Sequence, residues 1–377
     1  MNVAIIDADL IGLKKHRFPN LACMKISGYY KEIGCKVELK TDYENIDSYD
    51  KVFISKVFTD TPIDEELLNL QNVEYGGTGF YYDKAPNLPC VIEHHMPDYH
   101  LYDKWVENQI RNGGKRKDFE YYLDYSIGFT TRGCFRQCAF CVNKNYKKVE
   151  NHSPIDEFYD DSRKYICMLD DNILGSPNWK DIFLSLQEKN KPFQFKQGMD
   201  ERILNDEKCE VLLKSKYKGD YIFAFDNIDD KKVIIKKAEL IRKYFKSKGQ
   251  NIKFYVLCAF DKNNTYNEDF WIQDIKDTFE RIFILSKYNF KPYIMRYNAY
   301  IDSNYYGTYV NLACWCNQPS LFMNTSYRDF CIKDDNRKSN GEKRSATWRY
   351  FEQINNSEFD KYLDIVPKDL VVKYWSE

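Results

Sequence analysis

The segment TTRGCFRQCAFC, residues 130–141, places three cysteines within eight positions: Cys134, Cys138 and Cys141. No other part of the chain crowds thiols so closely. Polar neighbours such as Arg132 and Arg136 favour a loop over a buried core at this point. The segment continues the apolar stretch YSIGFTT, residues 125–131, which is typical of a strand. The spacing C-x3-C-x2-C therefore predicts clustered thiols in the loop that follows a strand.

From this strand onward, strand patterns alternate with helical patterns. The six predicted strands are YSIGFTT (125–131), YICMLDD (165–171), FQFKQGM (193–199), YIFAFDN (221–227), IKFYVLCAFD (252–261) and PYIMRYN (292–298). The first helical stretch, residues 154–164, has Ser153 at its N-cap and Pro154 at its first position. Repeated βα units with right-handed crossovers form a parallel sheet that curls into a barrel. We therefore predict a partial (β/α)6 TIM-like barrel over residues 120–305 and a C-terminal extension over residues 306–377.

The residues before the barrel form a second α/β pattern. The segment VAIID is a short apolar strand, and the helix that follows it has Asn20 at its cap. Further strands are predicted at KVELK (36–40), KVFISKVF (51–58) and VEYGGTGF (73–80). Residues 1–115 are thus predicted to form a small Rossmann-like unit, and the whole chain is of the α/β class.

Composition narrows the class of protein. The 377 residues are 43% hydrophobic, and Lys+Arg and Asp+Glu balance at 56 and 57, which gives a globular chain with a formal charge of −1. A protein held on nucleic acid by phosphate neutralisation usually has a basic excess, so nucleic acid is not indicated. No apolar run reaches the ~18–20 residues of a membrane span, and the N-terminus lacks the features of a signal peptide. We expect a cytoplasmic location, in which twelve cysteines are thiols or ligands and not disulfides.

Three thiolates in one loop suit one kind of metal centre. They can hold three irons of a [4Fe–4S] cluster and leave the fourth iron open, whereas ferredoxin-type runs supply a fourth cysteine and close the cluster. Zinc sites usually add a second pair of ligands, which does not follow here, although His152 is near. Burial as small apolar residues is a further alternative. Phe140, next to Cys141, suits a cofactor stacked beside the cluster.

C-x3-C-x-aromatic-C after the first strand of a βα barrel resembles the radical S-adenosylmethionine (SAM) superfamily, over about residues 120–300. The phrases FPNLACMKISGYYK, YGGTG and FKQGMDERIL further resemble a bacterial radical SAM group with a cobalamin-domain-like Rossmann unit before the barrel. The resemblance implies a reaction. The open iron chelates SAM, and reductive cleavage gives a 5′-deoxyadenosyl radical that abstracts hydrogen from a substrate. It also implies an electron donor such as flavodoxin or ferredoxin.

Other candidate site residues lie at predicted strand ends, where chemistry gathers in such folds. The resemblance implies that the end of the second strand meets the amino group of SAM, but the usual glycine-rich turn is absent. Asp170, Asp171 and Asn172 stand there as positional substitutes, or as turn caps. The predicted cofactor-binding residues are Phe140, Asp170, Asn172, Gln197, Asp226 and Asn298. Asp200 and Arg202 are predicted to meet substrate, or else to pair with each other structurally.

Two further features bear on cofactors. The family's cobalamin signature is D-x-H-x-x-G, and the nearest match, DYHLYD at Asp98–Asp103, has Asp in place of Gly. This degenerate motif predicts that cobalamin is an unlikely cofactor. Cys314, Cys316 and Cys331 either hold an auxiliary cluster or are ordinary packed residues.

The sequence leaves two other functions open: a non-catalytic iron–sulfur or zinc binding protein, and a radical enzyme that modifies tRNA or another nucleic acid. It names neither the substrate, nor the reaction after hydrogen abstraction, nor the oligomeric state.

Overall fold

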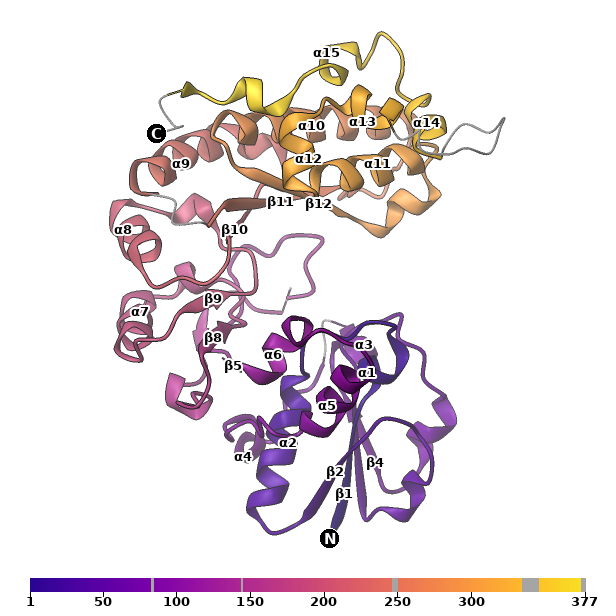
Figure 1. Cartoon of the computed structure of the whole chain (residues 1–377), viewed down its shortest axis with the longest axis vertical. Helices are drawn as coiled ribbons and strands as arrows, with labels where there is room; N and C mark the ends of the chain where they lie inside the picture. The colour runs from indigo at the N-terminus through magenta and orange to yellow at the C-terminus, as the bar shows by residue number, and fades with distance from the viewer. Residues whose placement is uncertain (83–84, 144, 246–249, 334–345, 374–377) are drawn as a thin grey trace. The chain divides into compact units, whose positions relative to one another are not determined.

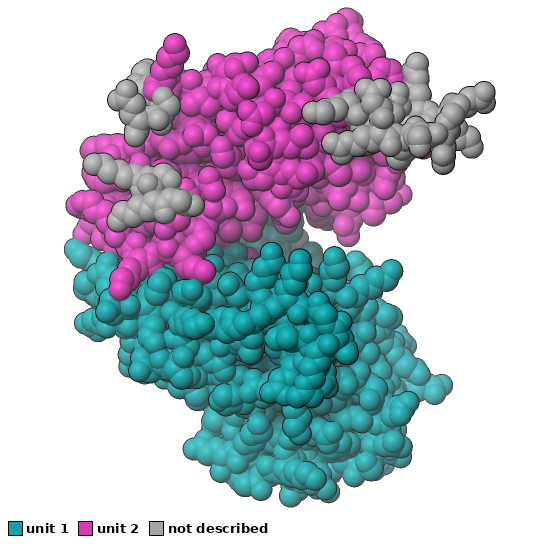
Figure 2. Space-filling model, in the orientation of Figure 1, with its two compact units in different colours: residues 1–196 teal, residues 197–377 magenta. Residues whose placement is uncertain are grey.

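The computed structural model describes residues 1–82, 85–143, 145–245, 250–333 and 346–373 (Figure 1). The chain divides into two compact units, Met1–Lys196 and Gln197–Glu377, which Figure 2 colours separately. The domain boundaries predicted at residues 115–120 and 305–306 stay predictions. In the described part of the chain, no helix is both long enough and apolar enough to span a membrane.

The first unit begins with a parallel four-stranded sheet in the order β2-β1-β3-β4. Its strands are β1 (Asn2–Asp7), β2 (Lys36–Lys40), β3 (Lys51–Ser55) and β4 (Val73–Gly76). The helices around it are α1 (Ala8–Gly12), α2 (Leu21–Glu32), α3 (Thr78–Tyr81), α4 (Cys90–Glu93) and α5 (Asp103–Arg111). The predicted cap of α2 is confirmed, because the Asn20 side chain accepts a hydrogen bond from the Cys23 N–H at 3.3 Å.

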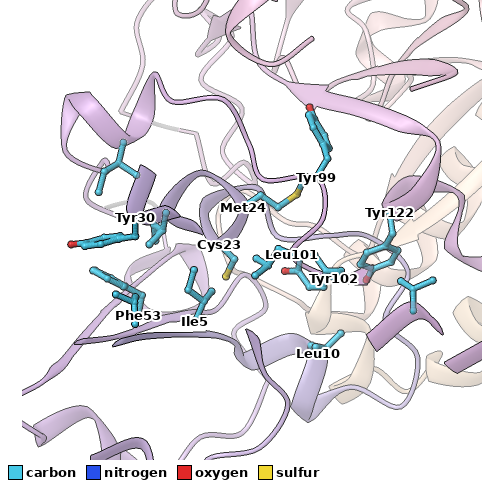
Figure 3. Close-up of a cluster of buried hydrophobic side chains, with 14 of the residues drawn as sticks. Ile5, Leu10, Cys23, Met24, Tyr30, Phe53, Tyr99, Leu101, Tyr102 and Tyr122 are labelled. Atoms are coloured by element: carbon cyan, nitrogen blue, oxygen red, sulfur yellow. The ribbon is translucent and has the colours of Figure 1, made fainter. Parts of the chain in front are cut away.

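Both faces of β1 are buried, as expected for a parallel sheet between two layers. Val3 and Ile5 join a core with α2 and the segment around Tyr102, whereas Ala4 and Ile6 join a second core on the other face. Figure 3 shows Cys23 and Met24 of α2 in the first core together with Ile5 and Tyr102. Alternation along one strand thus separates the two layers.

A second parallel sheet, in the order β5-β8-β9, completes the first unit. Its strands are β5 (Tyr125–Gly128), β8 (Tyr165–Met168) and β9 (Phe193–Phe195), and the nearby helices are α6 (Glu120–Leu123) and α7 (Trp179–Glu188). Two short strands, β6 (Thr131–Arg132) and β7 (Glu150–Asn151), pair antiparallel beyond the end of β5. Tyr99 packs in the core beside the first sheet and also contacts the second. Its hydroxyl donates to the Phe158 carbonyl at 2.6 Å and accepts from the Ile127 N–H at 2.7 Å.

The second unit holds a parallel sheet in the order β10-β11-β12. Its strands are β10 (Tyr221–Ala224), β11 (Ile252–Cys258) and β12 (Lys291–Arg296). Its helices are α8 (Asp206–Lys214), α9 (Lys231–Tyr244), α10 (Glu268–Lys287), α11 (Tyr306–Cys316), α12 (Pro319–Asn324), α13 (Tyr327–Lys333), α14 (Ala346–Phe351) and α15 (Asp360–Leu363). The longest, α10, buries Ile275, Phe279 and Ile282 along one helical stripe.

The six strands predicted from residue 125 onward are confirmed, and each sheet runs parallel in chain order. The described residues arrange them as two sheets of three, and neither sheet closes. The class is therefore α/β with parallel sheets. The single partial barrel stays a prediction.

The helix predicted over residues 154–164 is wrong beyond its first turn. Only a 3-10 turn, Ile155–Glu157, forms there. Phe158 is buried and packs so closely on Gly128 that an added Cβ would lie 2.2 Å from the ring. Arg163, at the end of the predicted helix, donates to the carbonyls of Tyr122 and Tyr99 at 2.7 and 2.8 Å. These tertiary contacts override the local helix signal.

Candidate functional site

The three cysteines lie in a loop whose base is a small antiparallel pairing. Thr131 pairs with Asn151, and Arg132 pairs with Glu150. The His152 N–H extends the pairing to the Thr130 carbonyl at 2.8 Å. We call the described residues between these two short strands, 133–143 and 145–149, the cysteine loop. It leaves the carboxyl end of β5, which is the edge where loops of parallel sheets gather active groups.

Within the cysteine loop, the three thiols are half-buried and belong to no disulfide. Backbone N–H groups point at two of the sulfurs: Arg136 N–H donates to Cys134 Sγ and Asn143 N–H donates to Cys141 Sγ, both at 3.4 Å. The Cys141 N–H donates to the Cys138 carbonyl at 2.9 Å and forms the turn between them. N–H groups directed at sulfur stabilise thiolate, the form that binds metal.

Over the ranges that the structure describes, no group of three or more His, Cys, Asp or Glu side chains is arranged to hold a metal ion. The fold thus brings Cys134, Cys138 and Cys141 into one loop, and their role as ligands stays a prediction. Phe140 is half-buried in the same loop.

The segment Asp170–Asn172, just after β8, holds the cysteine loop in place. Asp170 is buried, and its Oδ1 accepts from Thr130 N–H (3.2 Å), Thr130 Oγ1 (2.7 Å), Thr131 N–H (2.6 Å) and Thr131 Oγ1 (2.7 Å). Burial raises the pKa of Asp170, and these donors oppose that rise. The structure therefore uses Asp170 to anchor the residues that precede the cysteines.

The next two residues reach the loop itself. Asp171 accepts from the Gly133 N–H at 2.7 Å and from Asn143 Nδ2 at 2.6 Å. Asn172 donates from Nδ2 to Cys134 Sγ at 3.3 Å. Its Oδ1 is buried and accepts no hydrogen bond from any described residue. The strand register explains why Asp171 and Asn172 reach the loop. Gly128 of β5 lies opposite Met168 of β8, so the segments that follow these two strands leave the sheet side by side.

Glycine is required where the loop begins. Gly133 has φ +89°, a region that favours glycine, and an added Cβ would lie 2.6 Å from the Tyr146 side chain. The Tyr146 side chain thus leaves no room for a larger residue just before Cys134, the first cysteine of the loop.

The remaining predicted site residues belong to the second unit. Asp200 accepts from Arg202 Nε at 2.8 Å, and Arg202 also donates to Asp230 at 2.9 Å, so the structural pairing of Asp200 and Arg202 is present. Asp226 Oδ1 accepts from the Leu257 N–H at 3.1 Å, and burial raises its pKa. Gln197 and Asn298 are exposed. Their roles toward cofactor or substrate stay predictions.

Sequence reasoning missed one group in the same segment. Glu201 is buried, and burial raises its pKa to about 8, which makes it a neutral acid at neutral pH. Its side chain accepts from the Ala224 N–H at 3.1 Å. The sequence Asp-Glu-Arg gives no local sign that Glu201 is buried, because only the fold places it beside the end of β10.

The other cysteine group lies in helices of the second unit. Cys316 and Cys331 are buried, and Cys314 is exposed. Asn311 Nδ2 donates to Cys331 Sγ at 3.6 Å, and burial raises the pKa of the Cys316 thiol. The surroundings of Cys316 and Cys331 are those of packed cysteines in a core, and the auxiliary cluster stays an open alternative.

No family model matches the chain, and no curated protein matches it. It is similar to two solved structures of OxsB, described as a cobalamin-dependent S-adenosylmethionine radical enzyme. The structure with aqua-cobalamin bound gives a TM-score of 0.35 and 12% identity over 96% of this chain. The apo, selenomethionine-labelled structure gives 0.38 and 14% over 99%. This chain spans 56% and 58% of the two matched chains, somewhat more than half their length.

These comparisons correct one prediction. Both matched structures are of one protein that is described as cobalamin-dependent, which contradicts the prediction that cobalamin is an unlikely cofactor. The degenerate motif was too narrow a test. Asp98 accepts from Ser27 Oγ and Lys31 Nζ, both at 2.6 Å, and exposed His100 pairs with Asp103.

Proposed function

We propose that this chain is a radical SAM enzyme that binds a [4Fe–4S] cluster through Cys134, Cys138 and Cys141. The observation that supports this most is the cysteine loop itself. Three half-buried thiols follow the carboxyl end of β5, with N–H groups directed at Cys134 and Cys141. The donor set fits an iron–sulfur cluster, because thiolates are its ligands and hydrogen bonds to sulfur set its potential.

Other residues of the chain would position the cysteine loop and SAM. Asp170 and Asp171 hold the loop, and Asn172 tunes Cys134 by donating to its sulfur. The buried Asn172 Oδ1 is an acceptor that suits an ammonium group, such as the amino group of SAM. Phe140 offers an apolar face beside the cysteines. The cluster, when bound, supplies the electron that cleaves SAM and generates a 5′-deoxyadenosyl radical, and the protein orients the reactants and excludes solvent.

Two partners follow from this proposal. The cluster needs an electron donor of the flavodoxin or ferredoxin kind, and a substrate with a C–H bond that the radical can break. A cytoplasmic location suits both thiol ligands and such donors. The substrate class is left to experiment.

The test is anaerobic purification of the full chain with iron and sulfide reconstitution. We expect bound iron and sulfide, together with release of 5′-deoxyadenosine from SAM under a strong reductant. The Cys138→Ala variant should lose that release by more than about a hundredfold, since loss of outer ligand partners alone costs about 10–100-fold. Cys90→Ala, an exposed cysteine outside the loop, is the matched control and should behave as wild type.

Other results would identify the alternatives. Unchanged iron in Cys138→Ala would show that the ligand assignment is wrong. Iron without deoxyadenosine release would favour a non-catalytic iron–sulfur protein, and zinc in place of iron would favour a zinc protein. Retention on tRNA that weakens steeply with salt would point to a nucleic-acid substrate.

A further inference from the structure

Asp171 joins the two ends of the segment that contains all three cysteines. Its Oδ2 accepts from the backbone N–H of Gly133, the residue before Cys134, at 2.7 Å. Its Oδ1 accepts from Nδ2 of Asn143, two residues after Cys141, at 2.6 Å. One side chain from the neighbouring strand end thus spans the segment 133–143.

The chemistry of the three groups is complementary. A carboxylate offers only acceptors, and both groups that face it are donors: a backbone N–H and a side-chain amide. Hydrogen bonds to a charged acceptor are shorter and stronger than those between neutral groups. The half-buried position of Asp171 shields them in part from water. Both contacts therefore hold the segment more firmly than a neutral residue would.

We propose that Asp171 is a positioning residue of the cysteine loop. It closes residues 133–143 into a ring and so limits how far apart Cys134, Cys138 and Cys141 can move before any metal is bound. Pre-ordering a ligand loop lowers the entropy that metal binding must otherwise remove. This inference deepens the proposed function and rests on it for the metal, whereas the ring itself is a property of the polypeptide alone.

The first experiment tests the ring without metal. Limited trypsin digestion of the full apo chain reports exposure of the loop, because Arg132, Arg136, Lys147 and Lys148 are cleavage sites within or beside it. Asp171→Ala should be cut in this segment about tenfold faster than wild type, since losing charge-assisted hydrogen bonds raises the open population by about that factor. Asp161→Asn, an exposed Asp outside the loop, is the matched control and should be cut at the wild-type rate.

Exchange of the two side chains gives a sharper test. In Asp171→Asn the new amide can accept from Gly133 N–H, but its NH2 group then faces that of Asn143. In Asn143→Asp two carboxylates face each other. The double variant Asp171→Asn/Asn143→Asp restores one acceptor and one donor at each contact. Both single variants should be cut faster, and the double variant should return to within about threefold of wild type.

The second experiment tests the consequence for metal. After reconstitution, Asp171→Ala should release iron to an excess of chelator about tenfold faster than wild type, within the range seen when outer partners of ligands are lost. The double variant should restore the wild-type rate. The inference would be overturned if Asp171→Ala were cut by trypsin and released iron at the same rates as wild type. It would also be overturned if the double variant were cut as fast as the single variants. A wild-type chain that takes up no iron would instead refute the proposed function. The trypsin rates would still show whether Asp171 closes residues 133–143 into a ring.

Discussion

Two buried carboxylates stand at similar places in the first unit and are satisfied very differently. Asp7 is the last residue of β1 in one parallel sheet, and Asp170 follows β8 in the other. Asp170 Oδ1 accepts from four donors of Thr130 and Thr131. Asp7 Oδ2 accepts from Tyr102 Oη at 2.8 Å, and its Oδ1 has no partner among the described residues.

The difference shows what burial does to an acid. Burial raises the pKa of Asp7 to about 7 against the opposing hydrogen bond of Tyr102. His16 Nε2 lies 3.5 Å from Asp7 Oδ2, and burial lowers the pKa of His16 to about 4. At pH 7 His16 is therefore neutral, and Asp7 is about half protonated. Burial raises the pKa of Asp170 as well, but the four donors of Thr130 and Thr131 make this carboxyl group a structural anchor.

Removing Asp170 should have the largest effect. Asp170→Ala leaves two backbone N–H groups and two hydroxyls without an acceptor, and should lower the free energy of unfolding by about 3–5 kcal/mol. Urea denaturation measures this. Asp170→Asn keeps one acceptor oxygen and should fall between the alanine variant and wild type. A loss below about 1 kcal/mol in Asp170→Ala would show that Asp170 does not anchor the loop.

Asp7→Asn should change stability in the opposite direction. Because the folded pKa is raised from 3.8 to about 7, ionisation penalises the folded state progressively as pH rises between these values. The protonated Asp7 makes its full contribution to the free energy of unfolding below pH 3.8, and this contribution is lost above about pH 7. The variant should match wild type at low pH and be more stable by about 2–4 kcal/mol near pH 8.

The control for this prediction is Asp9→Asn. Asp9 is also buried, and its carboxylate accepts from the Val57 N–H at 2.7 Å. This variant should be less stable than wild type at both pH values. The lowered pKa of His16 costs stability only as pH falls below about 6.5, and Asp9→Asn should increase that cost because the charge of Asp9 raises the His16 pKa. An Asp7→Asn variant with the pH profile of wild type would contradict the assignment.

The smallest effect is expected at a single donor of Asp170. Thr131→Val keeps the shape of a fully buried side chain and removes one of the four hydrogen bonds. Three donors remain, so the free energy of unfolding should fall by about 1 kcal/mol. Thermal denaturation of Thr131→Val and Asp170→Ala measures how the losses of stability in the two variants compare. If Thr131→Val lost as much stability as Asp170→Ala, the stabilisation would come mainly from the Thr131 hydroxyl and would not be distributed over the four donors.

The strands were predictable because their signal is local. Runs such as residues 165–171 and 252–261 are apolar and bounded by turn residues, and β8 and β11 form within them. The helix over residues 154–164 failed because its apolar and basic side chains serve distant partners, as Arg163 does with Tyr99. The grouping of strands into sheets also depends on contacts that no local pattern contains.

The candidate site divides in the same way. The spacing of Cys134, Cys138 and Cys141, and their place after a strand, could be seen in the sequence. The contacts of Asp171 could not, because Gly133 and Asn143 lie 38 and 28 residues from it. Asp170, Asp171 and Asn172 were expected near a cofactor, and that role stays a prediction. The structure shows that Asp170 contacts Thr131, just before the loop, and that Asn172 contacts Cys134 within it.

The sequence by itself determined the α/β class, the strands and the presence of three thiols in one loop, because periodicity and residue spacing are properties of neighbouring positions. Only the tertiary structure decided which carboxylate is anchored, which is left with a bare oxygen, and which side chain closes the cysteine loop. Those outcomes depend on donors that the parallel register brings together from separate strands. Hydrogen-bond satisfaction in a buried place is a property of the assembled sheet and not of any segment.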